Sequence, residues 1–258
     1  MDITNISLKN RVLRNNNPLL PKNIRALIVG KSNCGKTTLL LNLLLKPGWL
    51  DYNNLLVFGN SLHQLEYQII KKGFEKGLSK DQVYSIFQNQ NVLEERNYSA
   101  LQAIEDFEGP LTNEINAQFF DSCELVPDPS SLNPQKKNLL ILDDCFLGKQ
   151  NKAEAYYTRG RHNNCDTIYI SQNYFKLPRQ TIRENANFII LFPQDSRNIN
   201  HLHADHCPYI PIEEFRELCT KVWKNKHNFV TIDLTTDYDK GKFRQNFQTF
   251  YIPDSVSH

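Results

Sequence analysis

An excess of charge of one sign is missing from this sequence. Its 258 residues carry 30 Lys and Arg against 28 Asp and Glu, which leaves a formal net charge of +2. A nearly neutral chain offers no bulk attraction for nucleic acid, so any DNA contact must come from a local basic surface. No stretch approaches the roughly 20 apolar residues that span a bilayer, and the polar N-terminal segment lacks the apolar centre of a secretory signal. We therefore expect a soluble, intracellular protein with no membrane partner.

Closely spaced cysteine pairs are missing as well, because none of the six cysteines belongs to a C-x-x-C motif. Scattered thiols of this kind are typical of the reduced state, so we expect no disulfide framework. One segment, "HLHADHC" at residues 201–207, does gather several side chains that can bind metal ions. Its spacing matches no zinc pattern and it has no second half, so a polar helix and loop is favoured over a metal site.

The chain is long enough to bury the core of one large domain. Residues 1–23 are rich in Asn and indicate an N-terminal arm, and residues 24–258 form the expected domain. Within it, residues 64–135 have a charged, helical pattern and could be an insertion. Residues 211–258 predict an amphipathic helix followed by a closing pair of strands.

Apolar runs alternate with polar, helix-prone segments along most of the chain. This alternation predicts an α/β fold with a mostly parallel central sheet flanked by helices. The expected buried strands occupy residues 26–29, 54–60, 138–146, 166–173 and 188–193.

The first apolar run ends in the motif G-x-x-x-x-G-K-T, written "GKSNCGKT" here, and a leucine-rich helical pattern follows. In such a loop the backbone N–H groups surround a phosphate, the lysine reaches the terminal phosphates and the hydroxyl binds Mg²⁺. Lys36 and Thr37 take these two roles, and the start of the next helix adds its positive dipole end. We therefore predict ATP and Mg²⁺ as cofactors. The predicted binding residues are Gly30, Lys31, Ser32, Asn33, Cys34, Gly35, Lys36, Thr37 and Thr38.

Two acidic residues follow the third apolar run, in "LLILDDCF". At the carboxyl end of a strand beside the phosphate loop, Asp143 would bind Mg²⁺, and Asp144 would orient or deprotonate the attacking water. The next strand ends in "SQN", where Gln172 could hydrogen-bond the γ-phosphate or that water. Between these strands, Arg159 and Arg161 flank Gly160. An arginine offered to the γ-phosphate, often by a neighbouring subunit, neutralises charge in the transition state.

The order of phosphate loop, Asp-Asp, Arg and polar strand end resembles the FtsK–HerA superfamily of P-loop ATPases. The resemblance is to the genome-packaging ATPases of poxvirus-like viruses, virophages and Maverick/Polinton elements, and it covers most of residues 24–192. It implies a RecA-like core with an additional strand, assembled as a homo-oligomeric ring that pumps double-stranded DNA into a capsid without reading its sequence. By position it implies Gln172 as the sensor of the γ-phosphate. It implies Arg161 as the trans-acting arginine, with Arg159 as the second choice. Many relatives outside the viral branch carry Asp-Glu where this chain has Asp143-Asp144, whereas the viral packaging branch often has Asp-Asp, so Asp144 is kept as the candidate base.

The resemblance also implies capsid or portal partners and a place in a viral factory of the host cytoplasm or in the nucleus. Two other functions stay open at this point: a P-loop nucleotide kinase, and a nucleotide-bound structural or assembly protein that hydrolyses little ATP. Small basic groups could contact DNA in a ring, but the sequence singles out none of them. These groups are Lys71-Lys72, Lys149 with Lys152, Lys176 with Arg179, Lys224 with Lys226, and Lys240 with Lys242.

Overall fold

The computed structural model describes residues 17–89, 96–145 and 151–256. Most of the expected N-terminal arm, residues 1–16, lies outside this range, and so does the basic residue Lys149. Residues 17–23 contact the domain directly: Leu20 is buried, and the backbone carbonyl of Leu19 accepts a hydrogen bond from Arg244.

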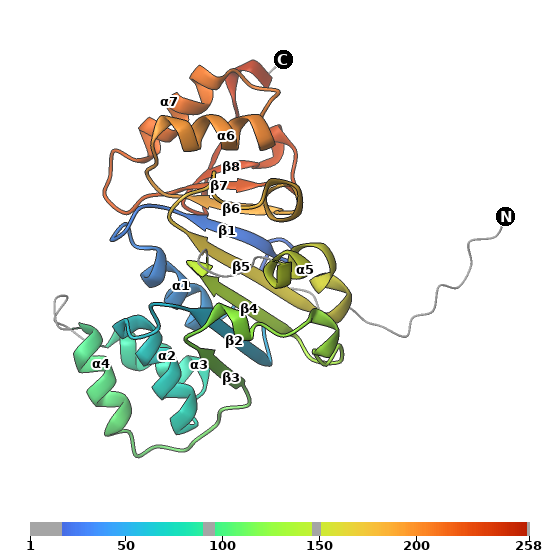
Figure 1. Cartoon of the computed structure of the whole chain (residues 1–258). Coiled ribbons are helices and arrows are strands. Elements are labelled where there is room, and N and C mark those ends of the chain that lie inside the picture. Colours follow the sequence, from blue (N-terminus) through green and yellow to red (C-terminus); the bar gives the residue numbers. More distant parts are fainter. Residues whose placement is uncertain (1–16, 90–95, 146–150, 257–258) are drawn as a thin grey trace.

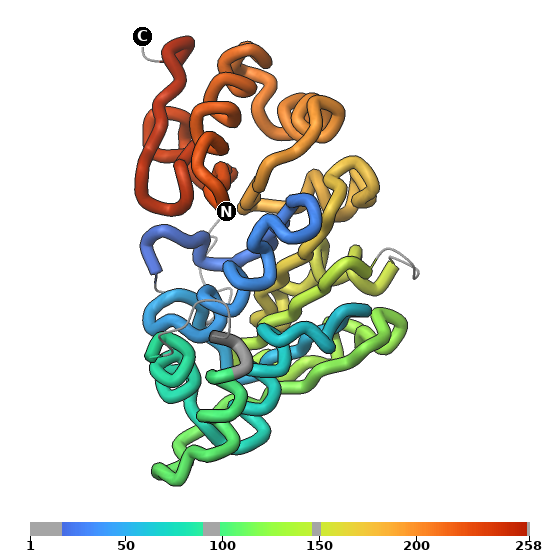
Figure 2. Tube along the Cα trace, turned by 90° about the vertical axis from the view of Figure 1, so that its left-hand side faces the viewer, coloured from blue at the N-terminus to red at the C-terminus, as the bar shows by residue number. Residues whose placement is uncertain are grey.

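A sheet of nine strands runs through the molecule, with α2–α4 at one end and α6 and α7 at the other (Figures 1 and 2). The first six strands in its spatial order are parallel, and the last three continue it in antiparallel fashion. The mostly parallel sheet predicted from the sequence is therefore confirmed. In spatial order the strands are β3 (Asn116–Phe120), β2 (Asn54–Gly59), β4 (Asn138–Asp143), β5 (Cys165–Ser171), β1 (Arg25–Val29), β6 (Phe188–Leu191), β7 (Val230–Asp233), β8 (Phe243–Gln245) and β9 (Thr249–Tyr251).

Helices cover both faces of this sheet, which is why its central strands are apolar on both sides. One face packs against α1 (Lys36–Leu45), α2 (Leu65–Lys76), α3 (Lys80–Gln88) and α4 (Arg96–Glu105). The other face packs against α5 (Asn151–Arg159), α6 (Ser196–His206) and α7 (Ile212–Val222). Strand β1 shows the alternation: Ala26 and Ile28 face the first layer, and Leu27 and Val29 face the second.

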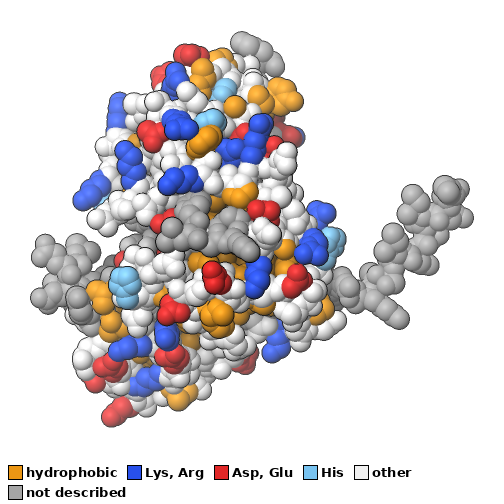
Figure 3. Space-filling model, viewed as in Figure 1, with side chains coloured by type: hydrophobic (Ala, Val, Ile, Leu, Met, Phe, Trp, Pro, Cys, Tyr) orange, Lys and Arg blue, Asp and Glu red, His pale blue; other side chains and the backbone are white. Residues whose placement is uncertain are grey.

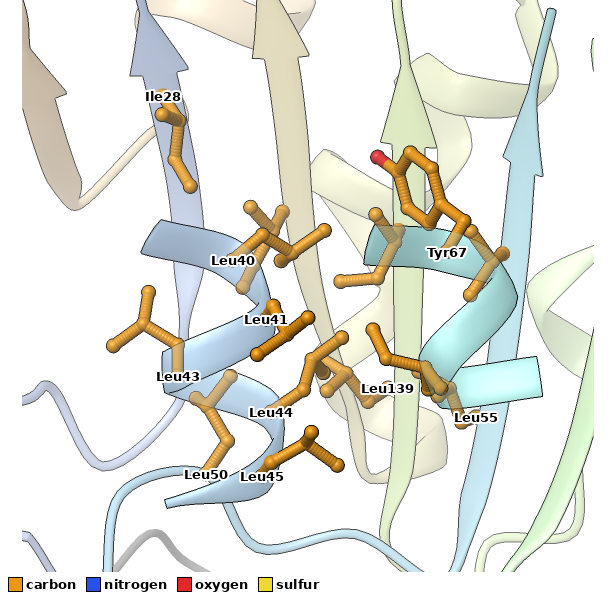
Figure 4. Packing of buried hydrophobic residues seen from close by; sticks show 14 of the residues in the cluster. Ile28, Leu40, Leu41, Leu43, Leu44, Leu45, Leu50, Leu55, Tyr67 and Leu139 are labelled. Carbon is orange, nitrogen blue, oxygen red and sulfur yellow. The ribbon is translucent and has the colours of Figure 1, made fainter. Parts of the chain in front are cut away.

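Helix α1 is held against the sheet by its leucines. Leu40, Leu41 and Leu44 are fully buried, and they lie on the side of α1 toward Leu139 of β4 and Leu55 of β2 (Figure 4). Complete burial of a leucine side chain stabilises the fold by about 2 kcal/mol. This packing fixes the start of α1, and with it the phosphate loop, relative to the strand ends.

Two strands depart from the sequence predictions. Residues 64–135 are helical through α2, α3 and α4, but they also contain β3, which pairs in parallel with β2 at the edge of the sheet. Its five residues are at most half-buried, so they lack the apolar run of a central strand. The two expected closing strands are present as β7 and β9, but they do not pair with each other, because β8, which was not predicted, lies between them. Its central residue, Arg244, is buried and forms an ion pair with Asp233, an exception to the rule that strand interiors are apolar.

The expectation of reduced cysteines is wrong for one pair. Cys123 and Cys145 form a disulfide with a Cα–Cα distance of 5.6 Å, across 22 positions of sequence. The pairing depends on strand order: β3 and β4 both flank β2, so the chain segments that follow them leave the same edge of the sheet. Spacing along the chain cannot show such a contact.

The remaining helix predictions agree with the structure. The "HLHADHC" segment forms the end of α6, and the amphipathic helix expected after residue 211 is α7. Among the described residues, no helix is both long and apolar enough to span a membrane.

Candidate nucleotide site

The loop between β1 and α1 has the backbone that its glycines predict. Gly35 has a φ of 105° and Asn33 a φ of 59°, both in the left-handed region. Gly30 is needed for close approach, since a Cβ there would lie 2.5 Å from the Cys34 sulfur and 2.6 Å from Cβ of Phe192. The Gly30 N–H donates to the carbonyl of Ser171, so the loop is also tied to the end of β5. Backbone geometry therefore requires both glycines of the motif.

The positive groups of a phosphate site lie in this loop. The ammonium of Lys36 donates to the carbonyls of Gly30, at 2.7 Å, and Lys31, at 2.8 Å, which holds it across the loop. Helix α1 begins after Gly35 with no hydrogen bond from a capping side chain and no acidic residue in its first turn, within the described part of the chain. The first N–H groups of α1 are thus free to bind an anion.

The two threonines that follow Lys36 are held by the start of α2, through its N-cap residue Gln64 and its second residue Glu66. Thr37 donates its hydroxyl to Oε1 of Gln64 at 3.1 Å. Thr38 donates to Oε1 of Glu66 at 3.3 Å. Gln64 and Glu66 therefore form a further side of the site, although neither residue belongs to the phosphate-loop motif.

Asp143 ends strand β4 and points to the same face of the sheet as α1 and α2. The hydroxyl of Tyr67, a fully buried residue of α2, donates to its Oδ2 at 2.7 Å; Figure 4 shows Tyr67 beside the upper end of β4. Burial raises the pKa of Asp143, the hydrogen bond from Tyr67 lowers it, the charge of Asp144 raises it, and that of Lys36 lowers it. The carboxylate is thus kept in a buried position by one specific donor.

Asp144 and Gln172 are in direct contact. Nε2 of Gln172 donates to Oδ2 of Asp144 at 2.8 Å, and its Oε1 accepts a hydrogen bond from the hydroxyl of Ser32 at 3.1 Å. Asp144 itself has a φ of 52°, and its N–H donates to the carbonyl of Ile170 in β5. Gln172 therefore connects the second carboxylate to the phosphate loop.

These residues line one cleft of about 720 Å³, a volume within the range of small-molecule sites. The donor set suits Mg²⁺, because Thr37 and Asp143 offer oxygen atoms and a phosphate chain can supply the rest. The residues around the cleft include Ser32, Lys36, Thr37, Gln64, Glu66, Asp143, Asp144, Gln172 and His227.

Arg159 and Arg161 lie far from this cleft, as their place in the chain requires. Both precede β5, whereas the cleft is at the end of β5, so the length of the strand separates them from their own phosphate loop. Arg161 is exposed and lies near Arg25 at the start of β1. The pKa of Arg25 is lowered first by its burial and then by the positive charge of Arg161. Arg159 is exposed and lies 3.5 Å from Asp128. Neither arginine can serve the cleft of its own chain in this arrangement.

Sequence reasoning missed four side chains of the site: Gln64, Glu66, Tyr67 and His227. Tyr67 belongs to an amphipathic helix whose next apolar residues are Ile70 and Phe74, so its periodicity indicates only a core position. Gln64 and His227 are single polar residues in connecting loops. Only the folded arrangement brings them to the phosphate loop.

The histidines of "HLHADHC" have separate partners in the structure. His201 stacks on Phe175, Nε2 of His203 lies 2.8 Å from the carbonyl oxygen of Ile210, and His206 packs edge-on against Tyr174. Across the described ranges, no group of three or more His, Cys, Asp or Glu side chains is arranged to hold a metal ion.

Fold and site together define a class of protein. Strand β5 lies between the phosphate-loop strand β1 and the Asp143 strand β4, which is the additional-strand arrangement of RecA-like P-loop NTPases. The fold predicted from the resemblance to the FtsK–HerA superfamily is thus confirmed.

Comparison with known proteins gives distant similarities. No protein-family model and no curated protein matches the chain. Among solved structures, the chain is similar to the genome-packaging NTPase B204 from Sulfolobus turreted icosahedral virus 2 in complex with AMPPCP. The identity is 12%, the TM-score is 0.45, and the match covers 88% of this chain and 98% of that one. It is also similar to VirB4 of Thermoanaerobacter pseudethanolicus, with 10% identity, a TM-score of 0.46 and 91% of each chain covered. Because these values are low, we infer the chemistry from the residues of the cleft alone.

Proposed function

We propose that this chain is an ATPase that moves double-stranded DNA and packages a viral or virus-like genome into a capsid. The observation that carries the ATPase part is the contact of Ser32, Gln172 and Asp144, which joins the phosphate loop to the acidic strand end across the additional strand. The DNA-packaging part rests on the resemblance of the linked motifs between residues 24 and 192.

In this proposal the phosphates of ATP lie along the loop, bound by the backbone N–H groups and by Lys36. Thr37 and Asp143 would hold Mg²⁺, which supplies positive charge to the terminal phosphates. To do so, the Thr37 hydroxyl exchanges its present acceptor, Gln64, for the ion. Tyr67 keeps the Asp143 carboxylate in place throughout.

Asp144 is the proposed general base and Gln172 the proposed sensor. A water molecule beside the γ-phosphate would donate its proton to Asp144, which is at hydrogen-bond distance from Gln172. The amide of Gln172 now joins Asp144 and Ser32, and a γ-phosphate would compete for its Nε2 donor. ATP binding would in this way break the hydrogen bond between Gln172 and Asp144, and Gln172 belongs to the segment that follows β5.

A ring of identical chains completes the proposal. In such a ring the neighbouring subunit would offer Arg161 to the γ-phosphate, with Arg159 as the second candidate. Basic and acidic side chains are mixed over the face in Figure 3, so DNA would be gripped by repeated local groups. Lys71, Lys72 and Lys240 already form ion pairs within the chain. Capsid or portal proteins are the further partners proposed, in a viral factory of the host cytoplasm or in the nucleus.

A direct test is steady-state ATP hydrolysis, measured against protein concentration with and without double-stranded DNA. Turnover of the wild-type protein should rise with assembly and with DNA, and Lys36→Ala should abolish it. Lys46→Ala is the matched control, because Lys46 is exposed just after the other end of α1. Hydrolysis that persists in Lys36→Ala would exclude the proposed site.

The same assay separates the other two functions. Transfer of phosphate from ATP to a nucleoside monophosphate, independent of DNA, would identify a kinase instead. ATP binding without turnover in the assembled protein would identify a structural or assembly protein.

A further inference from the structure

His227 reaches the nucleotide cleft from the loop that connects α7 to β7. Its Nδ1 lies 3.3 Å from the carbonyl oxygen of Cys34, and the ring lies 3.4 Å from the position that a Cβ on Gly35 would take. The side chain is exposed and lines the cleft. In Figure 1 this loop and the turn before α1 meet at the left of the molecule. An aromatic ring therefore stands at the rim of the phosphate loop.

The backbone holds this ring in a specific place. His227 has a φ of 68°, in the left-handed region that non-glycine residues adopt infrequently. The next residue, Asn228, anchors the loop, since its Nδ2 donates to the carbonyl of Val222 and its Oδ1 accepts from Asn246. A left-handed conformation at a cleft, kept by bonds on the residue beside it, indicates a functional constraint on where the ring points.

The strand order shows which end of a nucleotide the ring would meet. Asp143, Asp144 and Gln172 mark the terminal-phosphate end, and they come from β4 and β5 on one side of β1. His227 comes from the other side of β1, where β6 and β7 lie. A nucleotide whose γ-phosphate is at the carboxylates would extend its nucleoside toward His227. The phosphate loop itself contacts only phosphates, so the base needs a partner from elsewhere.

We propose that His227 is a nucleotide-binding residue whose imidazole ring stacks on the purine base. This inference rests on the proposed function, because it assumes that the cleft binds ATP. Stacking between an aromatic side chain and a base strengthens binding and tolerates different bases, since every base has a flat face. The ring acts on the nucleoside and leaves the phosphates to Lys36 and the loop.

Isothermal titration of two ligands, AMP-PNP and inorganic tripolyphosphate, both with Mg²⁺, tests this role. His227→Ala should weaken AMP-PNP binding by about tenfold and leave the affinity for tripolyphosphate unchanged, because only the first ligand carries a base. His227→Phe keeps a ring that can stack and should retain most of the affinity for AMP-PNP. Asn225→Ala, an exposed position in the same loop, is the matched control.

Each result has a defined meaning. Equal loss for both ligands in His227→Ala, no loss for either, or a loss in His227→Phe as large as in His227→Ala would overturn base stacking. Failure of the proposed function is a different result: wild-type protein would then bind neither ligand, or Lys36→Ala would bind both as well as the wild type does. Thermal unfolding of each variant shows whether the fold is kept.

Discussion

Tyr67 and Asp143 show how one buried hydroxyl can control the chemistry of a site. The carboxylate is buried, which raises its pKa, and the hydrogen bond from Tyr67 is the largest influence that lowers it. A carboxylate must be ionised to bind Mg²⁺ well. The ionisation of Asp143 therefore depends on a residue of α2 that lies outside the phosphate-loop motif.

Tyr67→Phe removes this donor and keeps the ring. The pKa of Asp143 should rise further, so the acidic limb of the pH–rate profile should move to higher pH. A hydrogen bond to a charged group contributes about 1.5–3 kcal/mol, which predicts at least a tenfold increase in the Mg²⁺ concentration needed for half-maximal turnover. Tyr52→Phe is the control, because it removes another buried hydroxyl that donates to the Leu44 carbonyl. Matching profiles for both variants would exclude this role.

His206 makes stability depend on pH at a second residue. Burial lowers its pKa to about 4, against the attraction of Asp205, and Lys242 and Arg183 lower it as well. The folded state thus binds fewer protons than the unfolded state between pH 6.5 and 4, so stability is complete above that window and is lost as pH falls through it. We expect a loss of about 3 kcal/mol in the free energy of unfolding.

Urea unfolding at a series of pH values checks this expectation. His206→Phe cannot gain the proton and should unfold with a flatter pH dependence between pH 6.5 and 4. His63→Phe changes an exposed histidine and should keep the wild-type slope. An unchanged slope in His206→Phe would assign the pH dependence to other groups.

Among elements, the central strands follow from their composition and the edge strands do not. β1, β4 and β5 are buried on both faces, so each contains an apolar run (ALIV, LLIL and IYI) that the sequence displays directly. β3 and β8 depend on pairing with a neighbour and on single contacts such as the ion pair of Arg244. A short strand whose stability comes from its neighbours leaves little trace in its own residues.

The disulfide between Cys123 and Cys145 joins the turn after the edge strand β3 to the segment that follows the central strand β4. Closing a loop of 22 residues restricts the unfolded chain and should stabilise the protein by about 3 kcal/mol. Cys123→Ser should therefore unfold at a lower denaturant concentration than the wild type without reductant. With dithiothreitol the two proteins should unfold together. Equal stability in the absence of reductant would show that the bond contributes nothing.

At the scale of the whole molecule, the arginines and the cleft lie at opposite ends of the parallel strands. A single chain therefore holds both halves of the proposed reaction centre but cannot bring them together. Two chains in a ring could bring them together, if the strand ends beside Arg161 of one chain faced the cleft of the next chain.

Mixing of two inactive variants tests this arrangement. Arg161→Ala should lower turnover at least about 1,000-fold and leave nucleotide binding intact. Mixed with Lys36→Ala, it should regain activity, because its intact cleft can receive Arg161 from the other chain. Arg216→Ala, an exposed arginine of α7 that bonds to Asn200, should behave as wild type. No recovery in the mixture would argue against an arginine that acts between subunits.

The sequence by itself determined the phosphate loop, the acidic strand end and the polar end of the next strand. Each is a short run whose chemistry comes from neighbours in the chain: glycines at fixed spacing, two carboxylates after an apolar run, an amide after another. Tertiary structure alone decided which residues complete the cleft. Gln64 and Tyr67 come from the start of α2 and His227 from the loop before β7, and only the packing of these elements brings them to the phosphate loop and to Asp143. Contacts between distant segments depend on how whole elements pack, and no local pattern of residues encodes that.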